Sequence, residues 1–205
     1  MGTTASPINP VEAKMWGNWQ TAIDCSWLCS DQIDRVMGQE LAHYFDFTGV
    51  TVNGKLTLRE DGTFTMTIDE AAVQALSQQI TQSVQGGLYG YLEQALAEEL
   101  SGFTLDAYLN ATGLTMEDLM TVAGVNMGQL VLDMIQPLRT VPCSGTYFVK
   151  DEQLHIAGTV CGFALTEDSL SIYAPVEGPP DGVSLSFPAL LPLEFIRVEA
   201  ISDVP

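Results

Sequence analysis

The sequence predicts a mainly β fold with an α insertion (α+β), an antiparallel β-barrel of about eight or nine strands holding an all-helical insert. The prediction depends first on two residues far apart in the chain, Trp19 in Gly17-Asn18-Trp19 and Arg197 in the last strand-like segment. Glycine admits a sharp entry of the backbone, and a guanidinium stacked on an indole would join the first strand to the last. Short hairpins of the kind that close a small barrel lie between them.

Alternating apolar residues, interrupted by Gly, Pro, Asn and Asp, predict the strands. The first covers residues 16–24. The clearest hairpin covers residues 50–68 and turns at Asp61-Gly62, because Asp-Gly suits a tight β-turn. Further strands are expected at residues 146–149, 154–156, 159–165, 170–173, 183–187 and 193–199.

The apolar period changes from two to between three and four after Asp69, which predicts an amphipathic helix over residues 70–100. Gly86-Gly87 and Gly90 within it predict a kink, a break or a close packing point. Shorter helices are expected after the capping residues Ser30 or Asp31, Thr104, Thr115 and Asn126.

These elements predict three parts of the chain. Residues 1–13 form a polar N-terminal linker, residues 14–69 and 143–200 form the barrel, and residues 70–138 form the helical insertion.

Composition excludes several classes of partner. The 205 residues include 26 acidic and 7 basic side chains, a formal net charge of -19, which repels nucleic acid and anionic membrane surfaces. No apolar stretch is long enough to span a bilayer, and the first residues do not form a signal peptide. Either the protein is cytoplasmic, or an export signal, with or without a lipid anchor, has been removed; we expect the second.

The cysteines favour export. If the chain turns at Glu152, Cys143 and Cys161 lie opposite each other across a hairpin, and Cys25 and Cys29 are close enough in sequence to bridge a tight loop or one helical turn. We therefore expect disulfides Cys143–Cys161 and Cys25–Cys29. The alternatives are free buried thiols and a zinc site, which neither the spacing nor a nearby histidine supports.

The β portions resemble the lipocalin-like (calycin) barrels, above all the small lipocalin-like domains of bacterial secreted or envelope lipoproteins of uncharacterised function. The matching segments are Gly17-x-Trp19, residues 56–64, Gly145-Thr146-Tyr147, residues 170–173 and Phe195-Ile196-Arg197. The resemblance implies that Gly17, Trp19 and Arg197 close one end of the barrel. It also implies an extracytoplasmic module, secreted or anchored by a lipid.

Two functions fit this sequence. The first is binding of a small hydrophobic ligand between the barrel mouth and the insert, where methionines offer an adaptable apolar surface. The alternative is a protein-interaction module, with a filled barrel presenting the insert to a partner such as an envelope protein. We expect no enzymatic activity, cofactor or metal, because neither His43 nor His155 belongs to a recognisable catalytic or ligand set. The candidate ligand-binding residues are Phe64, Met66, Tyr91, Met120, Tyr147 and Phe187.

Overall fold

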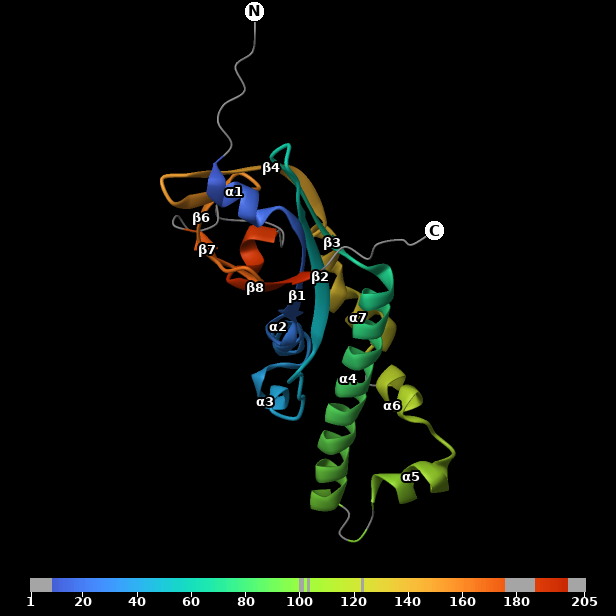
Figure 1. The fold of residues 1–205 in the computed structure, drawn as a ribbon. Coiled ribbons are helices and arrows are strands. Elements are labelled where there is room, and N and C mark those ends of the chain that lie inside the picture. Colours follow the sequence, from blue (N-terminus) through green and yellow to red (C-terminus); the bar gives the residue numbers. More distant parts are fainter. Residues whose placement is uncertain (1–8, 100–101, 103, 123, 176–186, 199–205) are drawn as a thin grey trace, which may run out of the picture. The chain divides into compact units, whose positions relative to one another are not determined.

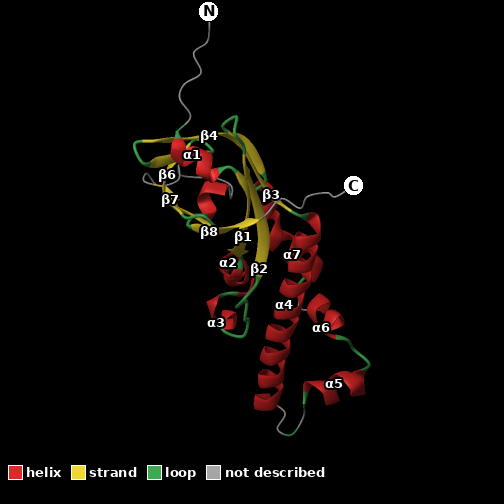
Figure 2. Cartoon of the chain, in the orientation of Figure 1, coloured by secondary structure: helices red, strands yellow, loops and turns green. Residues whose placement is uncertain are grey.

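The computed structural model describes residues 9–99, 102, 104–122, 124–175 and 187–198. The chain divides into two compact units, which are described separately. The first contains the barrel and is built from residues 1–23, 53–69 and 137–205; the second is mainly helical and is built from residues 24–52 and 70–136. Figure 1 traces the elements along the chain, and Figure 2 distinguishes helices from strands.

The barrel confirms the predicted fold class. Its eight strands follow one another around a closed barrel in sequence order, with the long helix inserted between β3 and β4. β8 returns to pair with β1 in an antiparallel ladder, so the sheet has no free edge. The strands are β1 (Gly17–Asp24), β2 (Thr51–Leu58), β3 (Thr63–Ile68), β4 (Cys143–Lys150), β5 (Gln153–Ile156), β6 (Thr159–Leu165), β7 (Ser169–Pro175) and β8 (Leu193–Val198).

The predicted joint between the first and last strands is present. Trp19 lies directly opposite Arg197 in the ladder, and the guanidinium carbon is 4.2 Å from the centre of the indole ring. Arg197 also donates hydrogen bonds to the carbonyl oxygens of Lys14, Trp16 and Glu167. Gly17 has φ +131°, and a Cβ there would stand 3.0 Å from the Arg197 Nη1, so glycine lets the strand begin against the guanidinium.

Side chains of the barrel fill its interior. Every second residue is buried along β2 and in β3 as far as Met66, as expected for strands with one face inward. Aromatic rings meet at the centre, where Phe187 lies 6.3 Å from Phe64 and 6.5 Å from Phe195 between ring centres. The largest fully buried side chains of this unit are Trp19, Phe64, Phe187, Phe195, Met15, Ile23, Leu56, Leu58 and Met66.

Two segments of the barrel unit differ from the prediction. Residues 10–13, assigned to a linker, belong to helix α1 (Pro10–Met15), and the Glu12 carboxylate accepts a hydrogen bond from the Val149 amide. Proline at the first helical position and the Asn9 cap explain why a helix starts there. The strand expected over residues 183–187 lies mostly outside the described residues. Phe187 itself begins the 3-10 helix η2 (Phe187–Leu190) instead of ending a strand.

The helical unit is organised around its longest helix. That helix packs against α5 and α7, and α2 packs against α3 and α7. The Glu93 carboxylate accepts a hydrogen bond from the Leu105 amide, which ties the start of α5 to α4. The helices are α2 (Ser26–Met37), α3 (Gln39–Ala42), α4 (Glu70–Glu99), α5 (Leu105–Thr112), α6 (Met116–Val122) and α7 (Met127–Ile135), after which the 3-10 helix η1 (Gln136–Thr140) leads to the barrel.

The glycines of α4 neither break nor end it, since the helix runs without interruption from Glu70 to Glu99 (Figure 1). Of the three outcomes predicted there, close packing is the one that occurs. Gly87 is buried against the Phe45 ring, and an added Cβ would stand 2.8 Å from the Phe45 Cγ. Gly86, one residue earlier, faces open space.

Three of the predicted helix caps are present, and one is wrong. Thr104, Thr115 and Asn126 cap their helices as expected, and Thr115 and Asp118 form a reciprocal capping box. The cap expected at Ser30 or Asp31 is wrong, because α2 already begins at Ser26, where the Asp24 carboxylate accepts the Ser26 amide. Among the described helices, none is both long and apolar enough to cross a membrane.

Candidate functional site

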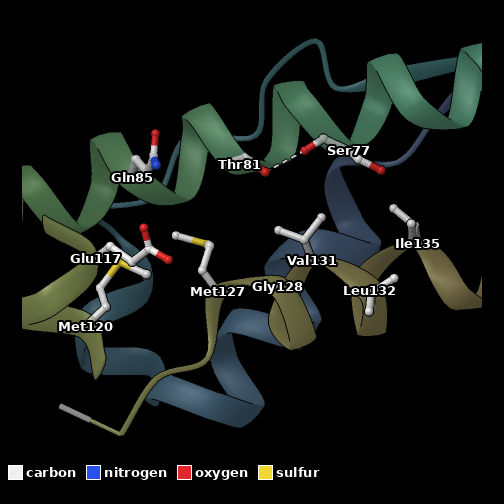
Figure 3. A pocket seen from close by; sticks show the side chains of 10 residues that line it. All are labelled: Ser77, Thr81, Gln85, Glu117, Met120, Met127, Gly128, Val131, Leu132 and Ile135. Carbon is white, nitrogen blue, oxygen red and sulfur yellow. Dashed lines mark hydrogen bonds between the residues drawn. The ribbon is translucent and has the colours of Figure 1, made fainter. Parts of the chain in front are cut away.

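The helical unit contains a pocket of about 500 Å³ between α4, α6 and α7 (Figure 3). Methionines and aliphatic side chains supply most of its apolar lining, and hydroxyl, amide and carboxylate groups supply the rest. Its lining residues are Ser77, Thr81 and Gln85 of α4, Glu117 and Met120 of α6, and Met127, Gly128, Val131, Leu132 and Ile135 of α7.

The α4 wall follows from helix periodicity. Ser77, Thr81 and Gln85 are four residues apart and form one stripe, beside the buried stripe of Leu76, Ile80 and Val84. The Ser77 and Thr81 hydroxyls donate to the carbonyl oxygens of Val73 and Ser77, at 2.9 and 2.8 Å. Each hydroxyl already donates a hydrogen bond within its own helix, so an occupant of the pocket does not need to supply an acceptor for it.

The α6 and α7 walls are set by their caps. The Thr115–Asp118 capping box starts α6 so that Glu117 and Met120, three residues apart, share one face. The Asn126 side chain accepts the Gln129 amide and starts α7 just before Met127. Figure 3 shows Glu117, Met120 and Met127 gathered at one end of the pocket.

The pocket has a buried floor and an exposed rim. Met120 is only 5% exposed, and Val131 and Ile135 are also buried. On the rim, Leu132 is 46% exposed, and Gln85, Glu117 and Gly128 are exposed as well. An apolar floor below an open rim is a surface that can receive apolar side chains from outside.

The chain around the pocket carries no positive charge. Between Arg59 and Arg139 the sequence contains no lysine, arginine or histidine, although α4 to α7 all lie in this stretch. In the rest of the helical unit, Arg35 forms an ion pair with Asp31 on α2 at 2.6 Å. The acidic residues of the insertion are Glu70, Glu93, Glu98, Glu99, Asp106, Glu117, Asp118 and Asp133.

Most of the predicted ligand-binding residues belong to the core of the barrel. Phe64, Met66 and Phe187 are at most 1% exposed among other side chains of the barrel. Tyr147 is buried too, and its hydroxyl donates to the Arg59 carbonyl oxygen at 2.9 Å. Burial and the nearby Glu12 raise the pKa of Tyr147 to about 12. These four side chains act as packing in this structure.

The other two predicted ligand residues lie in the helical unit. Met120 lines the pocket, whereas Tyr91 lies on α4 with its ring 5.5 Å from the ring of Tyr44. The sequence predicted a helix after Asn126, but no residue of α7 was among the candidate ligand-binding residues. The apolar positions 128, 131, 132 and 135 are spaced by three or four residues, and this spacing was the available signal.

The structure corrects the register expected for Cys143 and Cys161. Cys143 lies opposite Met66, and Cys161 lies opposite Leu154, so β5 separates their two strands. Strands two places apart lie about 9–10 Å from each other, beyond disulfide reach. The error arose because the chain reverses again at Ala157-Gly158, both with positive φ, before it reaches the position opposite Cys143.

No disulfide joins any of the four cysteines in the structure. Cys25 and Cys29 are buried at the start of α2, one helical turn apart. Burial raises the pKa of each thiol to about 12, and the neighbouring Asp24 adds to the shift. A Cys25–Cys29 bridge stays a prediction.

The chain has three pairs of adjacent acidic residues, Glu98-Glu99, Glu117-Asp118 and Glu167-Asp168, and all six side chains are exposed. The His155 ring stacks on Phe148 at 4.3 Å between centres. Within the described part of the chain, no three His, Cys, Asp or Glu side chains are grouped so as to hold a metal ion. The chemistry of the pocket is therefore that of an apolar surface with one carboxylate, from Glu117.

Comparison of the chain with family models, with curated proteins and with solved structures finds no match.

Proposed function

We propose that this chain is a non-enzymatic, extracytoplasmic binding module with a lipocalin-like barrel, and that its pocket between α4, α6 and α7 receives an apolar segment of a protein partner. The observation that carries the proposal is the contrast between the two units. The described core residues of the barrel are packed with almost no exposed surface, whereas the helical unit has a pocket of about 500 Å³ beside methionines.

The open rim favours a protein segment over an enclosed small molecule. Small-molecule pockets bury about 70–90% of their ligand. Here Gln85, Glu117, Gly128 and Leu132 of the lining are exposed, so an occupant would keep one face in solvent. A helix laid into a groove has this arrangement, with side chains on one face inserted and the other face wet.

Methionine supports the same role. Met120 and Met127 have unbranched, flexible side chains, which adapt to differently shaped apolar partners. The second candidate is a small hydrophobic ligand in the same pocket, and the volume favours it as much as it favours a peptide, because ligand pockets span about 300–1,000 Å³.

The proposed extracytoplasmic location and the proposed family are supported by the sequence resemblance, not by the pocket. The segments Gly17-x-Trp19 and Phe195-Ile196-Arg197 resemble those of lipocalin-like envelope domains, and the closure they form supports the resemblance. Export, and anchoring by a lipid, follow only from that resemblance. Thiol counting on denatured, unreduced protein from its own host tests export: an exported protein with the predicted Cys25–Cys29 bridge would show two reactive thiols, whereas a cytoplasmic protein would show four.

The binding proposal is tested with two neutral probes on the full chain. One is a labelled amphipathic peptide with a leucine ridge and glutamines elsewhere, followed by fluorescence anisotropy; the other is the neutral dye Nile red. We expect the peptide to bind and to displace the dye. Leu132→Gln removes about half of a leucine burial, or roughly 1 kcal/mol, and should weaken the peptide about fivefold.

Met127→Gln serves as a second pocket variant of similar size. Val122→Gln, at a side chain that is 84% exposed and outside the pocket lining, is the matched control and should leave both probes unaffected. If the dye binds and responds to Leu132→Gln but the peptide does not bind, the small-ligand alternative replaces the proposal. If neither probe responds to the two pocket variants, the pocket is not a binding site.

A further inference from the structure

We infer that the partner segment is cationic: a short amphipathic helix whose apolar ridge enters the pocket between α4, α6 and α7 and whose lysines or arginines face the acidic rim. This inference rests on the binding function proposed above and names the chemistry of its partner. It is carried by three observations: the length of the pocket walls, the carboxylate at the methionine end, and the absence of cations from the surrounding chain.

The walls match a short helix in length. The α4 stripe from Ser77 to Gln85 and the α7 wall from Met127 to Ile135 each extend over nine residues, whose eight steps rise about 12 Å along an α-helix. A segment of two to three helical turns would place about two or three apolar side chains along such a groove. These side chains would meet Met120, Val131 and Ile135 on the floor.

Charge then selects among amphipathic segments. Glu117 is exposed at the end of the pocket where Met120 and Met127 gather (Figure 3). Asp118, the next residue of α6, is exposed as well. No lysine, arginine or histidine lies between Arg59 and Arg139, so the insertion offers no counter-ion to an anionic group. A carboxylate or phosphate on the occupant would meet like charge only, whereas an ammonium or guanidinium would meet a carboxylate.

The same reasoning excludes one class of small ligand. A fatty acid or other anionic amphiphile needs a basic group or a set of amides for its head, and the pocket lining supplies a carboxylate, an amide side chain and hydroxyls that bond to their own helix. Overall charge alone would attract any cation to this acidic protein, so the inference requires the apolar ridge and the positive charge to act together.

Four synthetic peptides of one length separate these contributions, measured with the full chain by fluorescence anisotropy. Three share a leucine ridge and carry lysine, glutamine or glutamate on the polar face; the fourth keeps the lysines and replaces the ridge with serine. We expect the lysine-ridge peptide to bind about tenfold more tightly than the glutamine-ridge peptide at low salt, and the glutamate-ridge peptide to bind weakest. Salt at about 150 mM should reduce the difference in affinity between the lysine-ridge and glutamine-ridge peptides, because it screens the charges.

Glu117→Gln should weaken the lysine-ridge peptide about two- to fivefold and leave the glutamine-ridge peptide unchanged, because one partly exposed ion pair is lost. Glu194→Gln, at an exposed position of β8, is the matched charge control and should have a smaller effect. Equal binding of the lysine-ridge and glutamine-ridge peptides would overturn the inference while leaving the proposed function intact. Equal binding of the two lysine peptides would overturn it as well, since attraction would then need no groove. Failure of all three ridge peptides would instead remove the proposed function.

Discussion

Two adjacent glycines of α4 should respond in opposite directions to the same substitution. Gly86→Ala is expected to raise the free energy of unfolding by about 1 kcal/mol, because alanine is favoured over glycine by that amount in a helix interior and nothing lies within 4 Å of the new Cβ. Gly87→Ala gains the same helix propensity. Its Cβ, however, would stand 2.8 Å from the Phe45 Cγ and 2.9 Å from the Cε1, closer than real Cβ contacts.

The clash at Gly87 has no easy relief. Phe45 is buried, and its ring is nearly parallel to that of Phe47, 6.5 Å away between centres. Overpacking of this kind costs about 1–3 kcal/mol, so the net effect of Gly87→Ala is a loss of up to about 2 kcal/mol. The two variants should therefore differ by about 1–3 kcal/mol although their sequences differ only in the position of one methyl group.

Urea unfolding followed by far-ultraviolet circular dichroism measures this difference, since α4 is the longest helix described. The effect of Gly87→Ala is also measured in a Phe45→Leu background, which gives the coupling free energy between the two positions. The smaller leucine side chain removes the clash, so Gly87→Ala should stabilise the protein in that background. If Gly87→Ala stabilises the protein as much as Gly86→Ala, the packing of Phe45 on α4 is not as described.

Two further predictions concern the barrel closure and the buried thiols. Arg197→Ala should lower the free energy of unfolding by about 2–3 kcal/mol, because the stacking on Trp19 and the hydrogen bonds to backbone carbonyl oxygens are lost. The control Arg139→Ala removes the same charge at an exposed arginine and should lower it by less than about 0.5 kcal/mol. Equal denaturant midpoints for the two variants would contradict the described barrel closure. In the reduced protein, the pKa values of Cys25 and Cys29 are near 12, against 9.0 for an ordinary thiol. The stability that these thiols contribute is therefore fully present below about pH 9 and falls as the pH rises towards 12, because the unfolded chain loses its thiol protons first. Urea unfolding measured at a series of pH values gives the free energy of unfolding as a function of pH. Replacing both cysteines with alanine should remove most of its decline between about pH 9 and 12, and an unchanged decline would mean that the thiols are not buried.

The elements that the sequence predicted well are those with local causes. The Asp61-Gly62 hairpin, the capping box at Thr115 and the Asn126 cap depend on residues a few positions apart, so their patterns can be read directly. Elements that depend on distant partners were predicted less well. The start of α2 was misplaced because Cys25, a poor cap by type, is held by a hydrogen bond from its amide to the Val50 carbonyl oxygen.

The candidate site shows the same division. The sequence identified Met120 and the helical insertion, but it placed the site between the barrel mouth and the insertion, and four of its candidate residues are core side chains of the barrel. Whether a barrel of apolar strands is hollow depends on how side-chain volumes add up across strands that are far apart in sequence. The stretch without cations from Glu60 to Leu138 was visible in the sequence, yet it acquires a meaning only beside a pocket.

By itself, the sequence determined the class of the fold, the position of the insertion and the pairing of Trp19 with Arg197. The first two follow from the spacing of apolar residues and from turn residues, which are local features. The third follows because the first and last strands of a closed barrel must pair with each other. Only the tertiary structure decided that four of the candidate residues pack in the barrel core, that β5 separates Cys143 from Cys161, and that α4, α6 and α7 leave a pocket between them. These are outcomes of packing and register, which side chains from separate segments determine together.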